Sequence, residues 1–236
     1  MGIRAVLFDL DGTLLPMDQA TFTKAYFGGL AKRLAARGYE SEKLIKLIWQ
    51  GSAAMVGNDG EKTNEEVFWD RFSEIYGKDV RLDEPYFEEY YKADFDSVKS
   101  VCGFNHNAAK AVEEIKSLGL RTALATNPLF PSIATEKRIA WAGLNVCDFE
   151  LYTTYENSHF AKPNPKYYEE ILSKLHIKPS DALMVGNDVT EDMIAESLGM
   201  KVFLLTDNLI NRENADISRY PNGSFDELMI YIKTII

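Results

Sequence analysis

The sequence is poor in cysteine and histidine and carries few positive charges. Its two cysteines, Cys102 and Cys147, lie far apart and form no CxxC motif or Cys/His cluster, and the three histidines show no metal-ligand spacing. We therefore interpret the cysteines as reduced, partly buried thiols of an intracellular protein. Lys and Arg number 26 against 36 Asp and Glu, a formal net charge of -10. Because nucleic acids and anionic membranes are bound by clustered cations, this balance argues against both as partners.

Long hydrophobic runs are also missing. No apolar run approaches the roughly 18 residues that a membrane-spanning helix needs, and no charged and apolar leader precedes the first predicted strand. We therefore expect a cytoplasmic protein, either a monomer or a homodimer. Hydrophobic residues make up 46% of the chain, enough to build a packed interior. The length of 236 residues favours one core domain that carries a substantial insertion.

Short apolar segments alternate with helical patterns in most of the chain. Strands are predicted at 3–8, 121–127, 182–188 and 201–207. Amphipathic helices are predicted at 108–118 and 165–175, with a further helix ending near Gly199. Alternation of this kind is typical of an α/β fold with a doubly wound, Rossmann-like parallel sheet.

Residues 17–100 interrupt this alternation with helical patterns alone. A capping box is predicted from Thr63 to Glu66, and glycines punctuate the helices. The segment is too long for a loop and contains many aromatic residues, so we expect a separately packed helical cap over the strand ends. The predicted domains are a core of residues 1–16 and 101–236 and a cap of residues 17–100, with hinges near 15–18 and 96–103. We interpret the cap aromatics, Trp49 among them, as mainly cap core, with one or two of them lining the substrate pocket.

Polar residues end three of the predicted strands. Asp9 ends the first, Thr126 and Asn127 the second, and Asn187 and Asp188 the third. In doubly wound sheets ligands bind at the carboxyl ends of the strands, so these side chains are expected to meet.

The acids at this edge indicate metal and phosphate chemistry. A carboxylate at the end of a buried strand is costly without a cationic partner, and Mg2+ takes one or two carboxylates together with water and phosphate oxygens. Asp9 and Asp11 share a side of an extended chain, so one can attack a phosphoryl group while the other moves a proton. Thr126 can donate a hydrogen bond to a phosphate oxygen, and Lys162 supplies a positive charge.

Four segments in this order resemble the motifs of the haloacid dehalogenase-like hydrolase superfamily: "DLDGTLL" (9–15), "LATN" (124–127), "AKPNP" (161–165) and "VGNDVTED" (185–192). The helical insertion after the first motif resembles the type 1 cap of the phosphoglycolate phosphatase-like subgroup. The resemblance implies that Asp9 is the nucleophile and Asp11 the general acid/base. It also implies that Thr126 and Lys162 bind phosphate, and we assign the neighbouring Asn127 to the same role.

The resemblance further implies a Mg2+ site formed by Asp9, the backbone at Asp11, and Asp188. The fourth motif departs from the family pattern, because Asn187 stands directly after glycine where an aspartate is usual. We therefore assign the metal ligand to Asp188 and give Asn187 and Asp192 supporting roles, with Asp192 near Lys162 or the metal waters.

The function expected from these residues is a Mg2+-dependent phosphatase that acts on a small phosphorylated metabolite. A phosphomutase with the same aspartate pair stays open, as does a phosphonatase, which needs a lysine from the cap. A 2-haloacid dehalogenase is disfavoured because Asp11 is present. A catalytically silent binding protein is the alternative outside the enzymes.

Overall fold

The computed structural model describes residues 2–77 and 80–236. Within these residues five parallel strands form one sheet, in the order β2-β1-β3-β4-β5. The strands are β1 (Ala5–Phe8), β2 (Arg121–Leu124), β3 (Ala182–Gly186), β4 (Lys201–Leu205) and β5 (Asn222–Gly223). Because β2 lies on one side of β1 and β3 on the other, the strand order reverses at β1. The crevice at such a switch point is where ligands bind in these sheets.

Helices cover both faces of the sheet, as its apolar strands require. They are α5 (His106–Ser117), α6 (Ser132–Trp141), α7 (Pro165–Leu175) and α8 (Phe225–Ile235). Val6 and Phe8 of β1 belong to the buried cluster that includes α5 and α8, and Ala5 and Leu7 belong to the cluster that includes α7. Successive strand residues thus face opposite helical layers. The predicted doubly wound α/β fold is confirmed.

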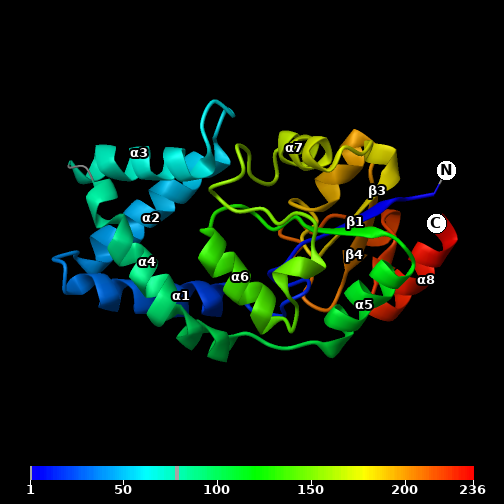
Figure 1. Cartoon of the computed structure of the whole chain (residues 1–236), viewed down its shortest axis with the longest axis horizontal. Coiled ribbons are helices and arrows are strands. Elements are labelled where there is room, and N and C mark those ends of the chain that lie inside the picture. The colour runs from blue at the N-terminus through cyan, green and yellow to red at the C-terminus, as the bar shows by residue number, and fades with distance from the viewer. Residues whose placement is uncertain (1, 78–79) are drawn as a thin grey trace.

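A second group of helices lies beyond the strand ends, on the side away from both termini (Figure 1). These helices are α1 (Gln19–Ala35), α2 (Ser41–Val56), α3 (Asn64–Tyr76) and α4 (Glu84–Ala93). The predicted capping box is present at the start of α3, where Thr63 and Glu66 satisfy each other's backbone N–H groups. The predicted helical cap is therefore confirmed.

The two chain segments that join this cap to the sheet lie side by side. The Gly103 N–H donates to the Pro16 carbonyl oxygen at 2.7 Å, and Met17 and Cys102 form an antiparallel bridge. The chain thus enters and leaves the cap at one place, close to both predicted hinges. Among the helices of the described residues, none is long and apolar enough to cross a membrane.

The structure corrects three details of the sequence analysis. The helix predicted to end near Gly199 is a short 3-10 helix, Met193–Leu198, and the short strand β5 was not predicted. The cap does not have a separate core, because its buried aromatic side chains form one continuous cluster with the α5 and α8 face of the sheet. Trp49 is 55% exposed and is therefore not part of the cap core, so it is one of the exceptions that the interpretation of the cap aromatics allowed.

Candidate active site

The loop after β1 fixes the position of its two acids. The Asp9 N–H donates to the Val185 carbonyl at 2.9 Å, which continues the pairing of β1 with β3, and the N–H of Leu15 turns back to Leu10 at 2.8 Å. Gly12 makes this turn with a φ of 88°, and a Cβ there would lie 2.4 Å from the Asn187 side-chain nitrogen. Only glycine fits both the backbone conformation and the close approach.

Asp9 lies between two donors that hold both of its carboxylate oxygens. Its Oδ1 is 2.8 Å from the Lys162 Nζ, and its Oδ2 accepts from the Thr13 hydroxyl at 3.1 Å. The Thr13 hydroxyl oxygen also lies 2.9 Å from the Asn187 Oδ1, so Asn187 joins the first motif to the fourth. The Asp9 carboxylate is thereby fixed in orientation within a nearly buried site.

Lys162 is almost completely buried between two acids. Its Nζ contacts the Asp192 Oδ1 at 2.6 Å as well as Asp9, and the Asp192 Oδ2 accepts from the Asp188 backbone N–H at 2.9 Å. Burial works to lower the pKa of Lys162, but the charges of Asp192 and Asp9 outweigh it and raise that pKa well above its ordinary value. Burial raises the pKa of Asp192, and the charge of Lys162 opposes this rise.

Gly186 makes room for Asp192, which yields a prediction. A Cβ at Gly186 would lie 2.1 Å from the Asp192 Oδ2, so Gly186→Ala must push the carboxylate away from Lys162 or the Asp188 N–H. We expect the free energy of unfolding of this variant, measured by urea denaturation, to be about 1–3 kcal/mol lower than that of the wild type. The matched control is Gly28→Ala on α1, where the added Cβ meets no atom within 4 Å apart from its chain neighbours and the backbone of its own helix. Equal stability of the two variants would contradict the prediction.

Asp11 pairs with a buried arginine that comes from α6. Arg138 is fully buried and its Nη1 contacts the Asp11 Oδ2, while its Nε donates to the Ala134 carbonyl at 3.2 Å and its guanidinium lies 4.4 Å from the centre of the Phe130 ring. The other oxygen of Asp11, Oδ1, is buried and has no hydrogen-bond partner among the described residues. Burial raises the pKa of Asp11, and the charge of Arg138 opposes the rise.

Asp188 lines the same crevice and is held by backbone and side chain. Its Oδ1 accepts from the backbone N–H groups of Thr190 and Glu191 at 2.8 and 3.0 Å. Its Oδ2 lies 2.8 Å from the Arg212 Nη1, and that arginine side chain is 57% exposed. Because exposed ion pairs contribute about 0–1 kcal/mol, a stronger ligand can displace Arg212 from this oxygen.

The second motif lies beside these acids. Thr126 is buried and lines the crevice, and its carbonyl accepts from the Tyr167 hydroxyl at 2.8 Å. Asn127 bridges two further motifs, because its Oδ1 accepts from the Lys162 N–H at 3.2 Å and its Nδ2 donates to the Glu191 Oε2 at 3.0 Å. The structure thus brings together all the residues that the sequence analysis selected for the site.

The charges of the site fit a divalent cation. Among the described residues here, five carboxylates (Asp9, Asp11, Asp188, Glu191 and Asp192) meet three cations (Arg138, Lys162 and Arg212). In the described part of the chain no group of three or more His, Cys, Asp or Glu forms a cage that could hold a metal ion. Mg2+ needs no such cage, since it keeps several waters and binds through one or two carboxylates and substrate phosphate. Hard oxygen donors with an excess of two negative charges suit that ion.

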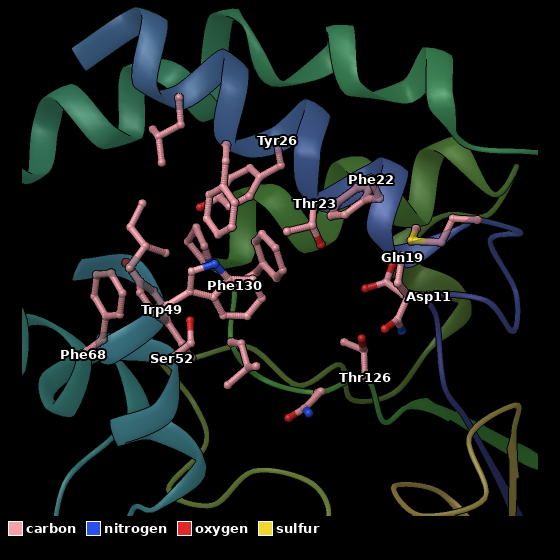
Figure 2. Close-up of a pocket in the computed structure, with 18 of the residues that line it drawn as sticks. Asp11, Gln19, Phe22, Thr23, Tyr26, Trp49, Ser52, Phe68, Thr126 and Phe130 are labelled. Atoms are coloured by element: carbon pink, nitrogen blue, oxygen red, sulfur yellow. The ribbon is translucent and has the colours of Figure 1, made fainter. Parts of the chain in front are cut away.

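A cavity of about 370 Å³ opens from these acids into the cap. Figure 2 shows Asp11 and Thr126 at one end and Trp49, Ser52 and Phe68 at the other. Side chains from the strand ends and from α1, α2 and α3 therefore line one continuous space. This volume lies within the range of about 300–1,000 Å³ that is usual for small-molecule sites.

Four residues of the site were not found in the sequence analysis: Thr13, Arg138, Glu191 and Arg212. Arg138 left a signal, because it shares the buried stripe of α6 with Ala134 and Thr135, where a charge is unexpected. Thr13 and Glu191 lie inside the quoted motifs. Arg212 lies in an irregular segment after β4, and the sequence carries no pattern that points to it.

Comparison with known proteins agrees with this geometry. A family model described as haloacid dehalogenase-like hydrolase matches residues 3–210. The chain belongs to this hydrolase family. A glyceraldehyde 3-phosphate phosphatase from Methanothermobacter thermautotrophicus is 24% identical over 92% of each chain. A phosphoglycolate phosphatase from Vibrio parahaemolyticus is 23% identical over 86% of this chain and 84% of its own length.

The fold is shared with solved structures of the same family. A HAD phosphatase from Thermococcus onnurineus superposes with a TM-score of 0.58 over 98% of both chains, at 19% identity. The resemblance inferred from the four motifs is confirmed by the family match, and the names of the relatives support an enzyme of the phosphatase class.

Proposed function

We propose that the protein is a Mg2+-dependent phosphatase that cleaves a phosphate monoester through an aspartyl-phosphate intermediate. The observation that carries this proposal is the state of the two acids after β1. Asp9 is fixed by Lys162 and Thr13, whereas Asp11 lines the same cavity and its buried Oδ1 has no partner within the described chain. A fixed carboxylate suits a nucleophile, and an unpaired oxygen beside it suits a proton carrier.

In the first half of the reaction an Asp9 oxygen attacks phosphorus and the bond to the ester oxygen breaks. Asp11 donates a proton to the departing alkoxide, and burial, which raises the pKa of Asp11 against the opposing charge of Arg138, favours this role. Lys162 and the Thr126 hydroxyl stabilise the negative charge on the phosphoryl oxygens. Asp192 keeps the Lys162 ammonium aimed at this position through its contact of 2.6 Å.

In the second half Asp11, now a carboxylate, takes a proton from a water molecule. The oxygen of that water attacks phosphorus, the bond to Asp9 breaks, and inorganic phosphate leaves. Both acids return to their starting protonation states. Asp11 therefore serves as acid and then as base, and one unpaired oxygen is enough for both steps.

Asp9, Asp188 and the backbone carbonyl at Asp11 would hold the Mg2+ ion. Bound there, the ion neutralises phosphate charge and polarises the phosphoryl group. Asp188 suits this role better than Asp192, because the exposed Arg212 on Asp188 is displaceable, whereas Asp192 is buried against Lys162. Asn187 supports the site through its contact with Thr13.

Removal of the metal tests this function. We expect phosphate release from a panel of monoesters to require added Mg2+ and to fall at least about 100-fold with excess EDTA, because metal polarisation supplies several kcal/mol to such reactions. Restoring Mg2+ should restore the rate, which controls for damage by the chelator. Release at the full rate in EDTA would reject the metal, and no release from any ester would favour a silent binding protein.

The same assay separates the other enzymes of the family. A phosphomutase would return phosphorylated sugar in place of free phosphate. A dehalogenase would release halide from 2-chloropropionate without Mg2+. The domain boundaries at residues 16/17 and 100/101, the cytoplasmic location and the choice between monomer and homodimer stay predictions.

A further inference from the structure

Aromatic rings form much of the cavity wall beyond the acids. They come from α1, α2, α3 and α4 of the cap and from the loop before α6, as Figure 2 shows in part, and include Phe22, Tyr26, Trp49, Phe68, Tyr91 and Phe130. The hydroxyls of Tyr26 and Tyr91 lie 2.7 Å apart and bond to each other. Because this bond occupies their polar ends, the two tyrosines present mainly ring surface to the cavity.

Positive charge is scarce on the same wall. Among the described residues that line the cavity, Arg212 is the only Lys or Arg, and it lies on Asp188 in the core. The charged cap residues of the lining are Glu84 and Glu88, of which Glu88 pairs with Lys92 at 2.6 Å. A carboxylate or second phosphate of a substrate would find no cation there, and a charge buried without a partner costs several kcal/mol.

We propose that the substrate is a phosphate monoester whose alcohol part carries a large, uncharged, apolar or aromatic group, and that this group packs in the cap. Small phosphorylated acids and diphosphates are poor substrates by the same argument. This inference rests on the proposed phosphatase function. Trp49 is its central residue, because it lines the cavity from α2 and offers a large, flat apolar surface to a ligand.

The test compares 3-phenylpropyl phosphate with phosphoglycolate in the presence of Mg2+. Both are esters of primary alcohols, so the comparison mainly reports binding of the alcohol part. We expect kcat/KM for the phenylpropyl ester to be at least about 100-fold higher. Equal values, or a preference for phosphoglycolate, would overturn the inference and leave the phosphatase in place. If neither ester is hydrolysed, the panel of monoesters decides the proposed function, and calorimetric binding of phenylpropylphosphonate against phosphonoacetate decides the inference alone.

Variants of Trp49 connect this preference to the cap. We expect Trp49→Ala to lower the ratio of the two kcat/KM values about tenfold, mainly through KM of the phenylpropyl ester, and Trp49→Phe to keep most of it. The control is Ile230→Ala on α8, which also removes an exposed apolar side chain but lies outside the cavity lining. A ratio unchanged in Trp49→Ala would count against the aromatic wall as the binding surface.

Discussion

Asp9→Asn is expected to lower kcat at least about 10^4-fold while the protein stays folded. Asparagine keeps the shape of the side chain, and its carbonyl oxygen can still accept from Thr13, which lies 3.1 Å from Asp9. It has no carboxylate to attack phosphorus, so the covalent path is closed. Because the site carries more acids than cations, loss of one negative charge also relieves repulsion. Steady-state phosphate release and thermal unfolding of the same preparation check both parts of the prediction.

The matched control is Asp70→Asn on α3. Asp70 is exposed and pairs only at the surface, with Lys62 at 2.7 Å, so its loss costs no more than about 1 kcal/mol and leaves kcat unchanged. If Asp9→Asn kept a tenth or more of the wild-type kcat, Asp9 would not be the nucleophile. If Asp9→Asn failed to fold, the contact between Asp9 and Lys162 would be needed for the stability of the fold and not for catalysis alone.

The residues at the strand ends were predictable because their signal is local. Apolar stretches as short as Val6 to Phe8 indicate a buried parallel strand, and the acid that follows must lie at the sheet edge. Parallel strands place their carboxyl ends together, so Asp9, Thr126 and Asp188 could be brought to one edge without knowledge of the packing. The capping box at Thr63 was equally local, since it depends on two residues three positions apart.

The cavity wall could not be predicted in the same way. Periodicity marks the apolar face of α1 and α2, but it does not tell which aromatic residues on that face contact a neighbouring helix and which border a space. Trp49 and Phe68 are both aromatic residues of cap helices, yet Trp49 is 55% exposed and Phe68 only 9%. That difference comes from how the cap helices pack, which is a tertiary property. Arg212 was not predicted for a related reason. It lies in an irregular segment, and its partner Asp188 is 24 residues away in the sequence.

The pairing of Arg138 with Asp11 leads to the second large effect. Arg138 has no exposed surface, and removal of one partner of a buried ion pair typically costs about 3–5 kcal/mol because the other charge stays behind. Asp11 keeps 21% of its side chain exposed, so we expect Arg138→Met to lower the free energy of unfolding by about 3 kcal/mol, at the lower end of that range. Methionine fills much of the space of the arginine stem, which limits the contribution of a cavity.

A double-mutant cycle separates the ion pair from simple loss of packing. In Arg138→Met/Asp11→Asn the unpaired charge is gone, so the double variant should be at least about 1.5 kcal/mol more stable than the sum of the two single changes predicts. Urea unfolding of the four proteins gives the coupling energy directly. If the changes in the free energy of unfolding were strictly additive, Arg138 would stabilise α6 through Ala134 and Phe130 alone. A clear coupling would mean that the fold holds Asp11 in place through Arg138, a residue that does not line the cavity.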